Sequence, residues 1–121
     1  WELIEGLTSI LITTRKGDIK MERSIKYVAT IKKWFDKVNG NTYHSARIIR
    51  LKDDKEIRVK WKYGYEEQYK TSCFKEMQNQ KWLVKYDNYS VGYWQRRNNY
   101  PIEWIDNGYG SRNVMVAWGR E

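Results

Sequence analysis

The sequence predicts an α+β fold in which a mainly antiparallel β-meander packs against one main helix, with further strands after it. Two observations lead to this fold class. Apolar and polar residues alternate along runs between residues 26 and 63, and short turn sequences separate these runs. After Gly64 the apolar residues instead recur at every fourth position, which is the spacing of one helix face. A length of 121 residues suits a single domain, residues 1–121.

The sequence predicts a strand in the N-terminal region and leaves open whether this strand joins the main sheet. Residues 7–14 (LTSILITT) are rich in β-branched side chains, and residues 15–18 contain a glycine and predict a turn. The chain begins with Trp1, and its first methionine is Met21. Residues 1–20 are therefore either an N-terminal extension or an added strand, and both interpretations stay open.

The meander follows from three runs and the turns between them. Residues 26–35 and 42–51 predict two strands, and the Asn-Gly pair at 39–40 favours a type I′ hairpin turn between them. The Asp-Asp-Lys sequence at 53–55 predicts a second tight turn. Residues 56–63 then form the third strand, in which every second residue is charged.

The main helix is predicted over about residues 65–80. Tyr65, Tyr69, Cys73 and Met77 are four positions apart, so they would lie on one face of that helix. Beyond it the sequence predicts three C-terminal strands at WLVKY, SVGYW and NVMVAW, with loops around the only proline and at residues 107–110.

Most of the positive charge lies in the meander. The whole chain has a formal net charge of +8, and residues 26–62 contain eleven cations against four anions. Such a charge favours attraction to polyanions but says little about fold. Nucleic acid, an anionic membrane surface and an acidic protein are the partners that this charge allows.

A cationic surface is predicted on the outer face of the meander. In a regular third strand, Arg58, Lys60 and Lys62 share one face, while Ile57, Val59 and Trp61 face the helix. The outer face would also carry the following residues of the first two strands: Lys32, Trp34, and either Arg47 or Arg50. Cations with embedded aromatic rings suit a phosphate backbone. The alternative is an ordinary solvated sheet face, on which Lys and Arg are common and also hinder edge aggregation.

A second candidate segment is YWQRRNNY at residues 93–100, which predicts a loop. Arg96 and Arg97 lie there between aromatic and amide side chains. Arginine can bind phosphate and guanine through two hydrogen bonds. Trp, Tyr and Arg are also typical of protein-binding hot spots, and a solvated hairpin loop explains the segment equally well.

The sequence predicts a protein that is not an enzyme and has no cofactor or metal. The only histidine, His44, is expected at a sheet surface, and the only cysteine, Cys73, is expected as a buried hydrophobe of the helix. No zinc-ligand spacing and no glycine-rich phosphate loop is present. With one cysteine and no run of about 20 apolar residues, we expect a cytoplasmic protein without a membrane span.

Two resemblances add to this interpretation. The order of three antiparallel strands and a helix over residues 26–80 resembles plant AP2-type and integrase arm-type DNA-binding domains, which implies a sheet that enters the major groove. The likeness is one of element order, so it implies no contact residues. Residues 34–48 (WFDKVNGNTYHSARI) and 63–69 (YGYEEQY) resemble small proteins of phages and mobile elements. That likeness implies an accessory or host-directed protein, in the host cytoplasm if viral.

These observations lead to three hypotheses for function. The first is a non-catalytic nucleic-acid-binding protein, with DNA favoured over RNA and a homodimer left open. The second is a phage-type inhibitor, similar to an anti-CRISPR factor, that uses its aromatic C-terminal third to bind a host nucleic-acid-handling or defence enzyme. The third is a glycan-binding module built on the seven Trp and ten Tyr, which the positive charge disfavours.

Overall fold

The computed structural model describes residues 11–13, 19–21 and 25–120. It confirms an α+β fold with a mostly antiparallel sheet. β1 (Leu11–Thr13) and β2 (Ile19–Met21) form a separate antiparallel pair. The strand prediction for residues 7–14 is thus confirmed over β1, while the rest of it and the turn at 15–18 lie outside the described residues.

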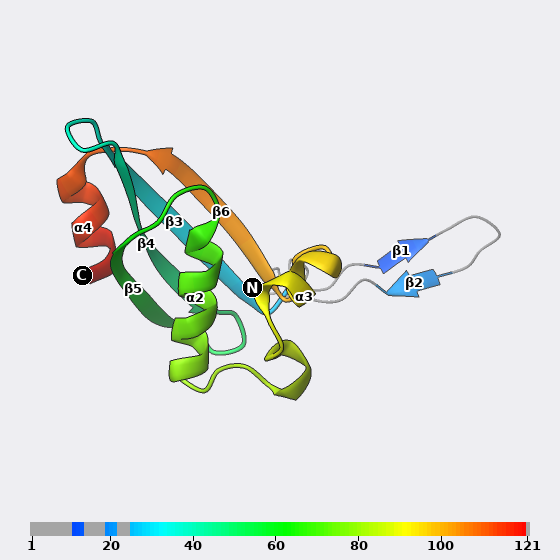
Figure 1. Ribbon diagram of the computed structural model, residues 1–121. Helices are drawn as coiled ribbons and strands as arrows, with labels where there is room; N and C mark the ends of the chain where they lie inside the picture. Colours follow the sequence, from blue (N-terminus) through cyan, green and yellow to red (C-terminus); the bar gives the residue numbers. More distant parts are fainter. Residues whose placement is uncertain (1–10, 14–18, 22–24, 121) are drawn as a thin grey trace.

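The main sheet has four strands in the order β5-β4-β3-β6 (Figure 1). Two hairpins join β3 (Tyr27–Asp36), β4 (Asn41–Arg50) and β5 (Lys55–Tyr63), which confirms the predicted meander. β6 (Ile102–Tyr109) pairs with β3 in parallel. The chain crosses from β5 to the opposite edge of the sheet before β6 begins, and the helices of this crossover cover one face.

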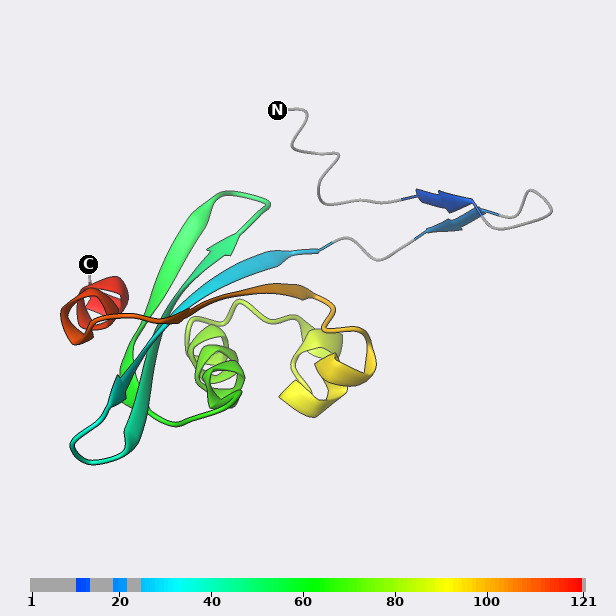
Figure 2. The same cartoon turned by 90° about the horizontal axis from the view of Figure 1, so that it is seen from above.

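The two faces of the sheet carry different helices. Figure 2 shows α2 (Gln68–Asn79) and α3 (Val91–Arg96) on one side, and α4 (Arg112–Arg120) on the other. A short 3-10 helix, η2 (Lys85–Asp87), lies between α2 and α3 in the chain. We call the two sides of the sheet the α2 face and the α4 face. Among the described residues, no helix has the length and apolar character needed to cross a membrane.

Both hairpins use the same four-residue loop. Asp36 pairs with Asn41, and Arg50 with Lys55, so four residues separate the paired ends in each hairpin. In each loop only the fourth residue has a positive φ. This angle is +70° for Gly40 in the first loop and +60° for Asp54 in the second loop. A type I′ turn needs two such residues in succession, so the predicted turn type is wrong although the hairpin is confirmed. The longer loop changes which residues of β3 and β4 stand opposite each other.

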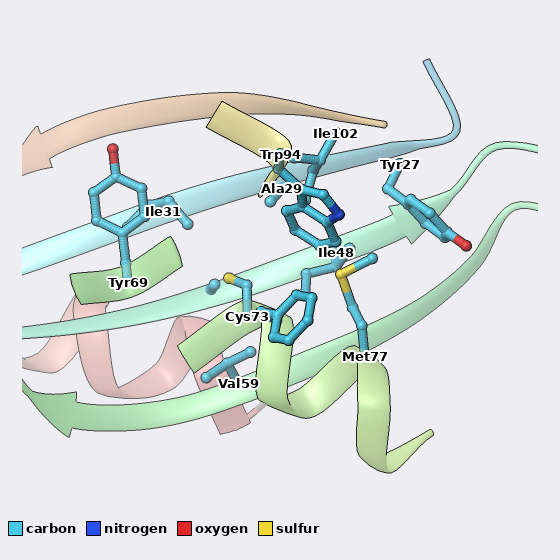
Figure 3. Packing of buried hydrophobic residues seen from close by; sticks show 12 residues of the cluster. Tyr27, Ala29, Ile31, Ile48, Val59, Tyr69, Cys73, Met77, Trp94 and Ile102 are labelled. Carbon is cyan, nitrogen blue, oxygen red and sulfur yellow. The ribbon is translucent and has the colours of Figure 1, made fainter. Parts of the chain in front are cut away.

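The hydrophobic core lies between the α2 face and the helices α2 and α3 (Figure 3). Ile31 and Ile48 of the sheet and Met77 of α2 are fully buried there, and Trp94 of α3 packs on Phe74 with ring centroids 4.9 Å apart. Burial of each such side chain contributes about 1.5–3 kcal/mol. The predicted helix is thus confirmed as α2, and its apolar face is the centre of the core.

The C-terminal third differs from the prediction. SVGYW forms most of α3 and NVMVAW most of α4, while WLVKY forms no strand. The signal that the prediction overlooked is a serine before each helix. Ser90 Oγ accepts from the Tyr93 N–H at 3.0 Å, and Ser111 Oγ accepts from the Val114 N–H at 3.2 Å. These are helix N-caps, and a short apolar run alone cannot distinguish a strand from a helix.

Candidate nucleic-acid interface

A β-bulge in β5 breaks the predicted cationic strip. Val59 stands opposite Ala46, but Lys62 stands opposite His44, so Lys60 and its neighbour Trp61 share the single position opposite Ser45. An extra residue in one strand reverses the facing of every residue beyond it. The prediction that three cations share one face is therefore wrong.

The bulge places the cations of β5 on different sides of the sheet. Arg58 lies opposite Arg47 and belongs to the α4 face. Lys62 lies opposite His44 on the α2 face. Lys60 occupies the bulge itself, beside Gly119 of α4, and its side chain is exposed.

Helix α4 lies directly on the sheet face that was expected to be open. A Cβ on Gly119 would overlap the Val59 carbonyl oxygen and would lie 2.9 Å from the Ser45 Cβ. Only glycine fits this contact. Ser45 is fully buried under the helix, and its hydroxyl donates to the carbonyl oxygen of Met115. The expected open basic face is therefore replaced by a helix-covered one.

Two of the predicted binding cations hold α4 in place. The Arg47 guanidinium lies 3.9 Å from the centre of the Trp118 ring, and its Nε donates to the Trp118 carbonyl at 2.9 Å. Lys32 Nζ lies 4.7 Å from the same ring. The Trp118 indole N–H donates in turn to the carbonyl of Thr30 at 2.9 Å. These cation–π contacts and hydrogen bonds fix the end of α4 to β3 and β4.

Arg50 is on the other face and has a different role. It donates two hydrogen bonds to the Asp53 carboxylate, at 3.0 and 2.8 Å, and its guanidinium lies 4.6 Å from the ring of Trp82. A guanidinium in this two-bond geometry has its charge paired with a carboxylate of the same chain. The sequence predicted that either Arg47 or Arg50 lies on the cationic surface. In the structure neither side chain is fully exposed.

The predicted loop at residues 93–100 is the end of a helix and a turn. Arg96 is the last residue of α3 and is exposed. The Arg97 side chain is mostly buried, 3.7 Å from the Asp87 carboxylate and 4.9 and 4.7 Å from the rings of Tyr93 and Tyr100. Arg97 therefore stabilises the packing of α3, and only Arg96 of this pair faces solvent.

Aromatic side chains form a continuous row across one end of the α4 face. Trp34, Tyr43 and Tyr63 stand directly opposite one another on β3, β4 and β5. Trp34 stacks on Tyr43 with centroids 5.5 Å apart, and Tyr63 meets Tyr43 edge-on at 5.8 Å. The bulge brings Trp61 to the same side, 5.4 Å from Tyr43, and Tyr65 continues the row 6.2 Å from Tyr63. We call these five residues the aromatic row.

The outer members of the aromatic row are exposed to solvent. Trp61 is 46% exposed, Tyr63 55% and Tyr65 54%. Trp34, predicted as an aromatic contact within the cationic surface, lies at the inner end of the row and is partly buried. Its indole ring has the Arg112 guanidinium 6.0 Å away. Exposed aromatic rings that lie together are typical of binding surfaces.

A small cavity separates the aromatic row from the beginning of α4. Its volume is about 160 Å³, and its lining residues are Trp34, Asp36, Tyr43, Trp61, Arg112, Met115 and Val116. The hydrogen bond from Asn39 Nδ2 to Asp36 Oδ2, at 2.8 Å, lowers the pKa of that carboxyl, so it is ionised at neutral pH. The charged and aromatic groups that line the cavity are thus three aromatic rings, the Asp36 carboxylate and the Arg112 guanidinium.

The only histidine and the only cysteine of the sequence lie in the core. His44 is buried: its Nδ1–H donates to the Gly64 carbonyl at 3.3 Å, and its Nε2 accepts from the Ser72 hydroxyl at 2.8 Å. Burial lowers the histidine pKa. The expected position at a sheet surface is thus wrong. Cys73 is buried as expected, and burial raises the pKa of its thiol. No group of three or more potential metal ligands occurs within the described part of the chain.

The sequence interpretation missed Tyr43, Trp61, Tyr63, Tyr65 and Arg112 as site residues. The prediction that Trp61 faces the helix is wrong, because the bulge turns its ring to the side of Tyr43. The prediction that Tyr65 lies on the buried helix face is also wrong, because α2 begins only at Gln68 and Tyr65 is exposed.

With the expected two-residue turn, Trp34 would have stood opposite Ser45, so the Trp34–Tyr43 stack was not visible. Arg112 was missed because α4 was predicted as a strand. The missed signals are the Asp36 side chain, which caps the longer loop, and Ser111, which caps α4.

Together, the fold and the site define a small α+β protein whose sheet has helices on both faces and an exposed aromatic row beside cationic side chains. Comparison of the chain with protein-family models, curated proteins and solved structures found no match. Any functional conclusion therefore depends on the geometry of the site.

Proposed function

We propose that this protein is a non-catalytic nucleic-acid-binding protein that uses the α4 face. The observation that carries the proposal is the aromatic row, in which Trp61, Tyr63 and Tyr65 are each about half exposed. Exposed rings next to cations are the combination that binds nucleic acid without a fixed sequence, through stacking and phosphate contacts.

The cations beside the row supply the second part of the argument. Lys60 follows Val59 in the bulge next to Trp61, Arg58 lies on the same face, and Arg112 forms part of the cavity wall. Arg58 also shares the Glu56 carboxylate, at 3.1 Å, with Arg47 at 3.6 Å. One carboxylate cannot neutralise two guanidinium groups, so this face keeps excess positive charge. A polyanion would release counterions on binding there.

Fluorescence anisotropy with labelled single- and double-stranded DNA and RNA, between about 50 and 200 mM salt, tests this proposal. One variant combines Arg58→Ala, Lys60→Ala and Arg112→Ala. The matched control removes three exposed cations elsewhere, with Lys52→Ala, Lys75→Ala and Lys85→Ala. We expect the first variant to bind more weakly and to lose about 2 from its log–log salt slope on a single strand, since each phosphate contact contributes about 0.7. The control should lose much less.

Two outcomes would contradict the proposal. The first is that wild type shows no binding at the lowest salt. The second is that both variants lose affinity equally, because binding would then depend on net charge and not on this face. Absence of binding would favour the second candidate, a protein-docking inhibitor, since exposed Trp and Tyr beside Arg are also typical of interface hot spots. The phage-type accessory role remains a prediction from the sequence resemblance.

A further inference from the structure

We infer that the cavity between the aromatic row and α4 holds one unpaired nucleobase, so that the preferred ligand is single-stranded nucleic acid. This inference rests on the proposed function and specifies its ligand. The inference depends on the lining of this cavity, in which Trp34, Tyr43 and Trp61 form ring walls. The remaining wall consists of Asp36, at the end of β3, and the first turns of α4.

The size of the cavity fits one planar ring. Its volume is about 160 Å³. An apolar cavity of about 150 Å³ is large enough to hold benzene, whereas drug-sized ligands occupy sites of about 300 Å³ or more. Trp61, which is 46% exposed, forms part of the wall, so solvent and ligand reach the ring from outside. One base enters such a site, and the sugar and phosphate stay outside it.

The charges around the cavity select a base over a phosphate. The Asp36 carboxylate in the wall is ionised, so it repels an anion that enters the cavity. A carboxylate can instead accept a hydrogen bond from the amino or imino groups of a base. Arg112 and Lys60 flank the rings and are exposed, so the phosphates on either side of the base have cationic partners. A neutral ring inside and phosphates outside is the arrangement that these charges favour.

Double-stranded nucleic acid does not suit this site. The bases of a duplex are stacked on each other, so their faces cannot contact Trp61 or Tyr43 without being unstacked. A sheet can enter a major groove only with an open face, and here α4 is anchored on one face by Trp118 while α2 covers the other. The major-groove arrangement implied by the DNA-binding domains that residues 26–80 resemble is therefore blocked by α4.

Indole N–H signals from ¹⁵N NMR test the cavity directly. The probe is a 12-nucleotide single strand, compared with the 12-base-pair duplex of the same sequence. We expect the single strand to shift the Trp34 and Trp61 signals. The Trp94 signal should stay constant, because that indole is fully buried and donates to the Asp87 carbonyl at 2.8 Å. The duplex should produce smaller shifts at equal concentration.

Affinity measurements with ring variants complete the test. Trp61→Ala should weaken single-strand binding by about 5- to 150-fold, the loss expected for one base–aromatic stack. Trp61→Phe should restore most of the affinity. Tyr86→Ala, which removes another exposed ring, in η2 and not in the wall of the cavity, should have no effect. Because Trp61 is half exposed, its removal should leave the fold intact.

The possible results separate this inference from the proposed function. Equal affinity for both nucleic-acid forms, with Trp61→Ala unchanged, would overturn the base cavity but leave phosphate binding by the α4 face in place. Binding to neither form would overturn both. A preference for the single strand that depends on Trp61 supports both. Trp34 and Trp61 signals that do not move while a single strand binds would place the ligand elsewhere and overturn the cavity assignment.

Discussion

The two faces of the same sheet are covered by helices in physically different ways. On the α2 face, aliphatic side chains such as Ile31 and Ile48 meet Met77 and Trp94 in a fully buried core. On the α4 face, Arg47, Trp118 and a buried serine hold the helix through cation–π contacts and hydrogen bonds. The comparison indicates that the α2 face mainly stabilises the fold. The α4 face keeps several charged side chains and aromatic rings exposed to solvent.

The largest contrast is expected between two tryptophans. Trp94→Ala removes a fully buried ring from the core and should lower the free energy of unfolding by about 3–5 kcal/mol. Trp61→Ala removes a ring that is 46% exposed and should cost under about 1 kcal/mol. Urea unfolding followed by circular dichroism measures both. Equal destabilisation of the two variants would contradict the claim that the core on the α2 face contributes most of the stability.

Alanine substitutions at two helical glycines test how α4 is attached to the sheet. Gly119→Ala should destabilise the protein by about 1–3 kcal/mol, because the new Cβ would overlap the Val59 carbonyl. Its control is Gly92→Ala in α3, where the nearest atom to the new Cβ is 3.7 Å away. That change should be neutral or stabilise by up to about 1 kcal/mol, since alanine favours helix.

The Trp118 indole N–H reports whether the same substitution loosens α4. In Gly119→Ala we expect its NMR signal to move, because the hydrogen bond to the Thr30 carbonyl would be lost. In Gly92→Ala the signal should keep its position. An unshifted Trp118 signal in Gly119→Ala would show that the helix tolerates the extra methyl group without moving.

The smallest effect is expected from pH, and it concerns the α2 face. His44 is the only histidine, and burial lowers its pKa in the folded protein. The unfolded chain therefore binds a proton at a higher pH than the folded protein does. The stabilisation is complete above the unfolded pKa of about 6.5 and decreases as the pH falls below it. Urea unfolding between pH 5 and 7.5 measures this slope.

His44→Gln is the variant that isolates this effect. It keeps a polar side chain between Gly64 and Ser72 but has no titratable group. Its stability should change less with pH over the same range, whatever its absolute value. A wild-type slope that persists unchanged in the variant would mean that other groups, and not the buried imidazole, cause the pH dependence.

The sequence was sufficient for the parts of the fold that periodicity controls. Three strands, two hairpins and the helix with Cys73 on its buried face were predicted within a few residues. Periodicity failed where a helix and a strand have the same short apolar pattern, as in NVMVAW, and there only the cap at Ser111 distinguishes them. β6 was missed because its Asn107-Gly108 pair resembles a turn.

The candidate site was harder to predict, because it depends on register. The alternation from Glu56 to Lys62 is perfect in sequence, yet the bulge at Lys60 and Trp61 reverses its second half. Nothing within that strand indicates the bulge, and Gly119, which closely approaches it in the structure, lies about 60 residues away in the sequence. Arg58, Lys60 and Trp34 remain on the proposed surface. Arg47, Arg50 and Arg97 instead have partners within the fold.

Photo-crosslinking tests most directly whether the α4 face is the binding face. A single-stranded oligonucleotide that contains bromouracil would be irradiated with wild-type protein, and the crosslinked residues identified by mass spectrometry. We expect crosslinks at the exposed members of the aromatic row, above all Trp61 and Tyr63. Crosslinks confined to Tyr86 and Tyr89, which are also exposed but lie beyond α2 in the chain, would contradict the assignment.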